Sequence, residues 1–305
     1  MRNIEKTKID PQDGLIAVGV NMHKSTEVYA AYHSELNNLK ILYDEYTNHT
    51  VPCCLEHLTP CYPDNHPSHN ALYSLYDSQR IVFKNLRKEV AERDNRLIYC
   101  PICNSTYVQD LDHYIPRSIM PEYSTHFYNL IPICHQCNKD KDNNWLDGNG
   151  KRIYFNAYFD PAPDISDVVD CCINIDPTSP CLQIKICVKP IVVTDNESVR
   201  LAKATTNALN LIKRYWQANA EQTLINVCKQ FINQYKVYEI KPFFEEFFAI
   251  QKKVLILDIN DAYPQEIIQN LVKRTILSSE IFKQWVQNEI NKGNYILLYS
   301  NTLFL

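Results

Sequence analysis

The chain has 305 residues and a hydrophobic fraction of 45%, which is typical of a globular protein and excludes disorder along the whole chain. Its net charge of -4 excludes a sequence-wide attraction to polyanions, so contact with nucleic acid must come from local basic patches or from a partner. No apolar run is long enough to cross a bilayer, and the sequence does not start with the apolar segment of a secretory signal. We therefore expect a cytoplasmic protein without membrane contact.

Helices separated by polar turns are the predicted elements, because the chain has only five glycines against sixteen prolines. Apolar residues at helical spacing predict helices over residues 25–46, 69–94, 197–235, 242–253 and 264–291. A short β region is predicted near 181–193, where the sequence reads CLQIKICVKPIVV. The expected fold class is α+β, with helices in the majority.

Two C-x-x-C steps stand out among the twelve cysteines, and they are formed by Cys100, Cys103, Cys134 and Cys137. In a cytosolic chain this pairing indicates metal binding rather than disulfides. Each step can place two thiolates on one tetrahedral ion, so the four predict a closed structural zinc site. The alternatives are four unrelated buried thiols and thioredoxin-like redox pairs.

A second group of potential metal ligands lies upstream in a proline-rich linker, and its members are Cys53, Cys54, His57, Cys61, His66 and His69. Such residues can bind zinc, but their spacing matches no standard site. A polar linker that happens to carry them is the competing interpretation.

Further motif residues lie between and after the C-x-x-C steps, and in chain order they are Asp112, His113, Pro116, Asn129, Leu130, Asn138 and Lys141. This order resembles the HNH endonuclease family, whose pattern is C-x-x-C, D-H-x-x-P, N-L and C-x-x-C-[HN]-x-x-K. The resemblance covers about one-sixth of the chain. The third position of the family name is Asn138 here, so the site is an HNN variant that keeps an oxygen ligand.

The resemblance implies a ββα-metal module at 96–150, stapled by the predicted zinc site. In that fold a hairpin carrying Asp112, His113 and Asn129 packs on a helix that begins near Asn138. The module would be embedded between a helical N-terminal region at 1–95 and a mainly helical region at 151–305. We expect the last region to direct the protein to its target or to dock a partner.

The same resemblance assigns roles to single residues. It makes His113 the general base, while Asp112 and Asn138 hold a catalytic Mg2+ or Mn2+ ion and Asn129 orients the His113 loop. A neutral imidazole suits the removal of a proton from water, and oxygen ligands suit Mg2+.

Three further residues have open alternatives. Lys141 and Arg117 are candidates for contact with substrate phosphate, although Lys141 could equally be a solvated surface lysine. His135 is a competing metal ligand, but its position between two zinc cysteines is expected to point it away from the catalytic cleft. Upstream, a run of charged residues predicts either a solvated helix face or a DNA contact, with Lys84, Arg87, Lys88 and Arg93 as its cations.

The function implied by the resemblance is metal-dependent hydrolysis of phosphodiester bonds in DNA. A compact catalytic insert within helical flanks looks like the nuclease components of antiphage defence systems, including the HNH subunit of Septu-type systems, which works beside an ATPase. One alternative is a catalytically inactive, zinc-stabilised protein that binds nucleic acid or acts as a scaffold. An RNA-directed nuclease is a second alternative.

Overall fold

The computed structural model describes residues 1–20, 22–78, 80–93, 96–175, 181–259 and 263–293. The chain folds as two compact units. Unit 1 comprises residues 1–163 and 191–209, and unit 2 comprises 164–190 and 210–305. The α+β class is confirmed, because helices dominate and the strands form small two-stranded antiparallel sheets.

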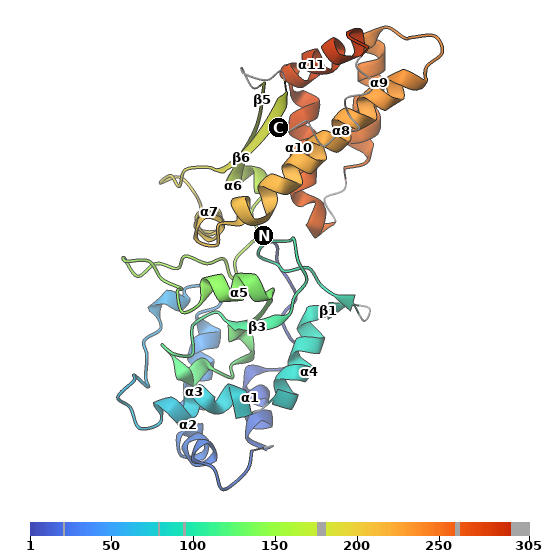
Figure 1. Cartoon of the computed structure of the whole chain (residues 1–305). Helices are drawn as coiled ribbons and strands as arrows, with labels where there is room; N and C mark the ends of the chain where they lie inside the picture. Colours follow the sequence, from blue (N-terminus) through green and yellow to red (C-terminus); the bar gives the residue numbers. More distant parts are fainter. Residues whose placement is uncertain (21, 79, 94–95, 176–180, 260–262, 294–305) are drawn as a thin grey trace. The chain divides into compact units, whose positions relative to one another are not determined.

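Unit 1 surrounds a short hairpin with helices (Figure 1). Its strands β3 and β4 pair in antiparallel register, with Asp112 opposite Ile131 and His113 opposite Leu130. Its elements are α1 (Pro11–Val20), α2 (Glu27–Asn48), α3 (His69–Ser78), α4 (Arg80–Ala91), β1 (Glu92–Arg93), β2 (Arg96–Leu97), β3 (Asp110–His113), β4 (Leu130–Ile133), α5 (His135–Lys141) and α7 (Glu197–Ala208).

Helix α2 forms where the sequence predicts it, because a polar cap and an apolar face coincide. The Thr26 side chain accepts a hydrogen bond of 3.1 Å from the Tyr29 amide and so caps the helix. Its buried face includes Tyr43 and Tyr46, which are one helical turn apart near the end of the helix. This face is therefore available to pack against other parts of unit 1.

The segment between β3 and β4 is part of the same core as α2. The Tyr43 hydroxyl lies 2.7 Å from the Thr125 hydroxyl, and the Tyr46 hydroxyl donates to Asn129 Oδ1 at 3.2 Å. His126 is fully buried, with its ring 4.5 Å from that of Tyr43 and 4.2 Å from that of Tyr46. The β3–β4 connection is therefore held in place by a helix far upstream in the chain.

Arg152 joins three more segments of unit 1. Its guanidinium group is buried and forms ion pairs with Asp160 and Glu56, each at 2.9 Å. It also donates to the Tyr114 hydroxyl at 3.3 Å, one residue after β3. Because a buried charge is costly unless paired, this network fixes the register of the 152–160 segment against the residues that follow β3.

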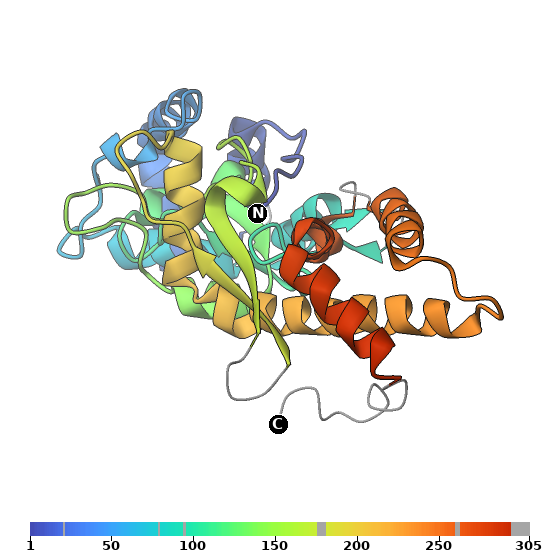
Figure 2. The same ribbon diagram turned by 90° about the horizontal axis from the view of Figure 1, so that it is seen from above.

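Unit 2 is a helical body around one β-hairpin (Figure 2). Strands β5 and β6 pair along their length, and in β6 buried and exposed residues alternate so that one face packs on α8. Phe231 of α8 is buried against Phe248 and Phe282, at ring distances of 5.1 Å and 5.3 Å. The elements are α6 (Ile165–Val168), β5 (Val169–Ile175), β6 (Leu182–Val188), α8 (Gln217–Val237), α9 (Phe244–Leu257), α10 (Ile267–Ser278) and α11 (Glu280–Asn291).

Two of the long predicted helices are shorter in the structure. The helix predicted over 197–235 ends at Ala208 and resumes through a π-helical turn, because Asn210 adopts a left-handed conformation with φ of 51°. The helix predicted over 264–291 breaks at Ser279, whose side chain caps α11. The prediction over 69–94 becomes α3 and α4, while residues 79 and 94 lie outside the described residues. Helix α1 and strand β5 are absent from the prediction.

The division into regions 1–95, 96–150 and 151–305 stays a prediction, and the two compact units of the structure have other boundaries. Both of the predicted boundaries lie inside unit 1, because α2 and Arg152 pack against the β3–β4 connection. Within the described ranges no helix is long and apolar enough to cross a membrane.

Burial of His126 predicts that acid destabilises unit 1. Burial lowers the pKa of His126 to about 3, so the folded chain keeps this imidazole neutral while the unfolded chain protonates it near pH 6.5. Its stabilising effect is complete above pH 6.5 and is lost as the pH falls from 6.5 towards 3, by about 1.4 kcal/mol per pH unit. His126→Gln should be less stable at pH 7 but should lose less stability between pH 6.5 and 4. Urea unfolding across this pH range measures the free energy of unfolding of each variant. The control is His33→Gln, because His33 is exposed. If the free energy of unfolding fell equally with pH in both variants, the effect of His126 would be contradicted.

Candidate functional site

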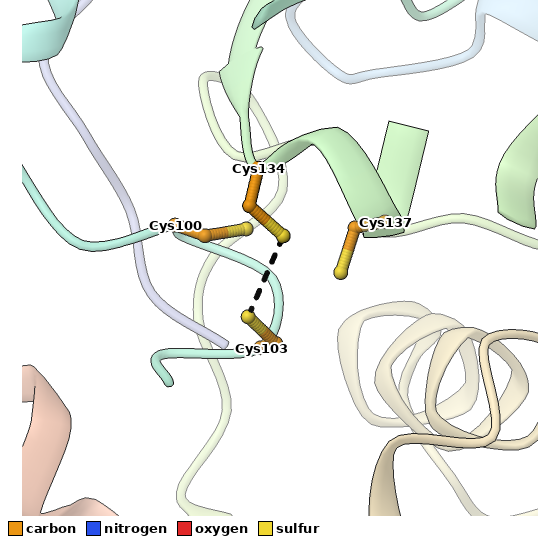
Figure 3. A group of neighbouring side chains, drawn as sticks. All are labelled: Cys100, Cys103, Cys134 and Cys137. Carbon is orange, nitrogen blue, oxygen red and sulfur yellow. Dashed lines mark hydrogen bonds between the residues drawn. The ribbon is translucent and has the colours of Figure 1, made fainter. Parts of the chain in front are cut away.

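The four cysteines of the two C-x-x-C steps meet in the interior of unit 1 (Figure 3). All four are buried, and their sulfur atoms lie within 4.8 Å of one another, with Cys103 Sγ 3.9 Å from Cys134 Sγ. Sulfur atoms bound to one tetrahedral zinc at about 2.3 Å would be about 3.8 Å apart. The geometry and the all-sulfur donor set therefore fit a structural zinc ion, as the spacing predicts.

Local backbone geometry brings the first pair of thiols together. Tyr99 and Tyr107 form a β-bridge that closes a narrow loop, and Asn104 turns the chain with φ of 54° while its amide donates to the Cys100 carbonyl. The Ser105 amide points at Cys103 Sγ, 3.5 Å away. Such amide donors favour a thiolate, which is the form that binds metal.

The second pair of thiols lies at the start of α5. Cys134 is the residue before the first turn and Cys137 lies within the helix. The cysteine cluster therefore connects the 100–103 loop to the N-terminal end of α5. A hydrogen bond with the neighbouring Cys100 lowers the pKa of Cys103. Burial raises the pKa of Cys100.

The second predicted metal group is not assembled. Among the residues that the structure describes, the four buried cysteines are the one group of three or more potential Cys, His or carboxylate ligands close enough to share an ion. His69 Nδ1 instead faces the Tyr62 carbonyl at 2.7 Å, and Cys61 is exposed. The linker interpretation of Cys53, Cys54, His57, Cys61, His66 and His69 is the one that the structure favours.

The predicted catalytic carboxylate and amide lie where α5 packs on β3. Asp110 and Asp112 are two residues apart on β3 and so share one face of the strand, whereas Asn138 and Lys141 share one face of α5. Asn138 Nδ2 donates to Asp110 Oδ2 at 3.1 Å, and Lys141 Nζ lies 3.1 Å from Asp112 Oδ2. The structure therefore places Asn138 in contact with Asp110 rather than with Asp112.

The Asp112–Lys141 pair is buried, with relative exposures of the side chains of 8% and 3%. Lys141 Nζ also donates to the His113 carbonyl at 2.8 Å. Burial raises the pKa of Asp112 to about 6, and the nearby Lys141 charge opposes that rise. The expectation of a solvated surface lysine at 141 is wrong, because the i+3 spacing after Asn138 turns Lys141 onto the strand.

His113 is the last residue of β3, and its ring is partly buried against Tyr76 at a centroid distance of 4.7 Å. Its Nε2 lies 2.8 Å from the Ser124 carbonyl oxygen. Because a carbonyl only accepts, Nε2 carries the proton and Nδ1 keeps its lone pair. Burial lowers the pKa of His113 to about 3, which holds the ring in this neutral form.

Asn129 is fully buried and uses both ends of its amide. Its Nδ2 donates to the Ile115 and Tyr123 carbonyls at 3.0 Å and 3.1 Å, and its Oδ1 accepts from the Ile115 amide at 2.8 Å. These bonds join Asn129 to both ends of the loop from Ile115 to Tyr123. The next residue is Ser124, whose carbonyl accepts the hydrogen bond from His113 Nε2. Its predicted role in orienting His113 stays a prediction that these contacts favour.

A cavity of about 540 Å³ opens beside the β3–α5 contact and is lined by Asp110, Asn138 and His135. His135 Nδ1 lies 3.0 Å from Asp110 Oδ2. His135 therefore lies at this cavity together with Asn138, whereas Asp112 and His113 are not among the residues that line it. Because α5 begins at His135, the i+3 spacing puts it on the same helix face as Asn138.

Arg117 lies outside this cavity lining and already has a carboxylate partner. Its guanidinium group is 2.8 Å from Asp77 Oδ2 and stacks on Tyr73 at 4.2 Å. Its contact with substrate stays a prediction. Sequence reasoning missed Asp110 and Tyr76; the two-residue repeat of a strand could have signalled Asp110, but nothing local signals Tyr76.

Loss of one zinc cysteine should release the metal and destabilise unit 1, because the loop and α5 would lose their common anchor. Purified protein is expected to contain one zinc per chain, and Cys134→Ser should lose it and melt lower by on the order of 10 °C. Metal analysis and thermal unfolding measure both effects. Cys61→Ser is the matched control, since Cys61 is exposed and lies in the second predicted group. Folded wild-type protein without zinc would rule the site out.

Comparison with known proteins agrees with this local geometry. No curated protein and no solved structure matches the chain. Residues 94–144 match the family model described as HNH endonuclease. The matched segment contains all four zinc cysteines together with β3, β4 and α5, so this chain carries an HNH endonuclease domain stapled by a cluster of four cysteines.

Proposed function

We propose that the protein is a metal-dependent endonuclease that hydrolyses phosphodiester bonds in DNA. The observation that carries the proposal is the state of His113: its Nε2 proton is committed to the Ser124 carbonyl, and its Nδ1 lone pair is retained. An imidazole nitrogen that keeps its lone pair, as Nδ1 of His113 does, can accept a proton from water. The HNH match supplies the reaction class.

The oxygen donors near β3 and α5 fit a hard divalent ion. Asp110, Asp112 and Asn138 offer two carboxylates and an amide, and such donors suit Mg2+ or Mn2+. When bound, the ion would neutralise charge on the phosphate and on the departing 3'-oxygen. We propose Asp112 and Asn138 as its ligands, with Asp110 orienting the Asn138 amide through their hydrogen bond.

The bond-breaking step uses His113 as the proton acceptor. Water loses a proton to Nδ1 while its oxygen forms a bond to phosphorus and the bond from phosphorus to O3' breaks. The 3'-oxygen leaves and takes a proton from solvent. Lys141 stabilises this arrangement by holding the Asp112 carboxylate and the His113 backbone carbonyl together.

The alternative of an inactive, zinc-stabilised binding or scaffolding protein is less well supported. The HNH match and the Nδ1 lone pair that His113 retains favour a nuclease over such a protein. A nuclease directed at RNA uses the same phosphodiester chemistry. DNA is preferred here because the HNH match favours it.

Bacterial antiphage defence is the proposed setting, with unit 2 as the part that docks a partner such as an ATPase. Unit 2 carries exposed apolar side chains on and beside α9, among them Phe243 at 81% and Leu257 at 76% exposure. Exposed apolar groups of this kind favour protein docking. Copurification with an ATPase from the native host tests this part.

His113→Ala should abolish cleavage while zinc content and DNA binding persist, because a general base acts on the reaction and not on the fold. The expected loss of rate is on the order of a hundredfold to ten-thousandfold. Plasmid cleavage with Mg2+ measures it, with the exposed His57→Ala as control. An unaltered rate in His113→Ala would refute the assignment.

If Asp112 and Asn138 bind the catalytic ion, substituting each of them should reduce the rate of cleavage by a different factor. Asp112→Asn removes a charged ligand and should reduce cleavage more than Asn138→Ala, which removes a neutral one. Raised Mg2+ or added Mn2+ should partly restore Asn138→Ala. Cleavage rates titrated against each metal, with zinc content and melting temperature as controls for folding, give the comparison. Full wild-type activity in a chelator that leaves zinc bound would contradict metal dependence.

A further inference from the structure

The cavity beside Asn138 has a second wall that the HNH match does not include. Asp110 and Asn138 line one side, and the other side is built by α3 and α4, upstream of residue 94. Lys84 and Arg87 of α4 both line this second wall. The cavity therefore has Asn138, one of the two proposed metal ligands, on one side and a pair of cations from outside the matched segment on the other.

Helix α4 is held against β3 by Arg87 itself. Arg87 Nη1 donates to the Gln109 carbonyl at 2.9 Å, one residue before β3 begins. This bond uses one of the five N–H donors of a guanidinium group, and the side chain is exposed. The remaining donors are available to a ligand in the cavity.

Neither cation is neutralised by the protein. In the described ranges no carboxylate forms an ion pair with Lys84 or Arg87. The two carboxylates that line the cavity are engaged elsewhere: Asp77 pairs with Arg117 at 2.8 Å, and Asp110 accepts from Asn138 and His135. Two unpaired cations beside a cavity favour an anionic ligand.

We propose that Lys84 and Arg87 bind phosphates of the nucleic-acid strand that enters the cavity beside Asn138. The proposal rests on the proposed nuclease function. Residues at i and i+3 of a helix lie about 5–6 Å apart at Cβ, so the pair can contact neighbouring phosphates along one strand. Arg87 offers forked donors that match phosphate oxygens, and Lys84 offers a point charge.

The net charge of the chain means that cations for nucleic-acid binding must come from a local patch or from a partner. A protein of net charge -4 gains no general attraction to a polyanion, and the 96–150 segment has six carboxylates against four Lys and Arg side chains. Binding must then come from placed cations. Lys84 and Arg87 are placed where a strand would enter the cleft beside Asn138.

The test measures nucleic-acid binding by the full-length protein. The protein carries His113→Ala so that it does not cleave the nucleic acid during the measurement. Fluorescence anisotropy with a short duplex DNA, across a salt series, compares Lys84→Gln, Arg87→Gln and the double variant. Each lost phosphate contact should reduce the salt slope by about 0.9 and weaken binding about fivefold to tenfold at 0.1 M salt. Single-stranded DNA and RNA of the same sequence show which backbone is preferred.

Lys88→Gln is the matched control, because Lys88 is an exposed lysine of the same helix that does not line the cavity. It should bind like the parent protein. Arg87→Lys keeps the positive charge but loses the guanidinium bond to the Gln109 carbonyl. Retained binding in this variant would show that the charge, rather than the anchoring of α4, is what binds phosphate. Zinc content and melting temperature show whether each variant is folded. Equal losses in Lys84→Gln and Lys88→Gln, or no loss in Lys84→Gln, would overturn the proposal.

Wild-type cleavage distinguishes this failure from failure of the proposed function. If the wild-type protein cuts DNA but Lys84→Gln and Arg87→Gln bind and cut as it does, only the assignment of α4 is wrong. If wild-type protein cuts neither DNA nor RNA with any divalent metal, the nuclease function is itself wrong, and the phosphate-binding proposal falls with it.

Discussion

The contact between α5 and β3 is the constraint on which the site depends. At the start of α5, Cys134 and Cys137 join the 100–103 loop through the cysteine cluster, and further along, Asn138 and Lys141 face Asp110 and Asp112. A helix of seven residues has too few internal hydrogen bonds to be stable alone. The cysteine cluster and the buried Asp112–Lys141 pair therefore set both the position and the rotation of α5, and with them the geometry of the cavity.

Sequence reasoning predicts the parts of this site that depend on spacing alone. Two thiols at C-x-x-C spacing reach one ion whatever surrounds them, so the cysteine cluster could be predicted from four letters. The environments of Lys141 and His135 could not be predicted, because they depend on the rotation of α5 about its axis. That rotation is decided by the packing of α5 against β3. Lys141 is buried, although lysines are usually exposed, and His135 is exposed but lines the cavity.

The same division holds for the fold. Helix α2 has its own cap and apolar face, and local signals are enough to predict it. The helical pattern breaks at Asn210 because this residue adopts a left-handed conformation, and apolar periodicity does not reveal such a residue. The bonds from Tyr43 and Tyr46 to the β3–β4 connection span 82 and 83 residues, and no local pattern encodes such pairs.

These long-range contacts connect the matched segment to the rest of unit 1. Its loop is stabilised by α2, the residues after β3 are held by Arg152, and the outer wall of its cleft comes from α4. The segment itself carries more carboxylates than cations, so it would repel a polyanion if it were exposed alone. The surrounding helices thus contact the segment and place the cations Lys84 and Arg87 beside its cavity. A catalytic motif of this size can be recognised from its sequence, but its cleft is a property of the whole of unit 1.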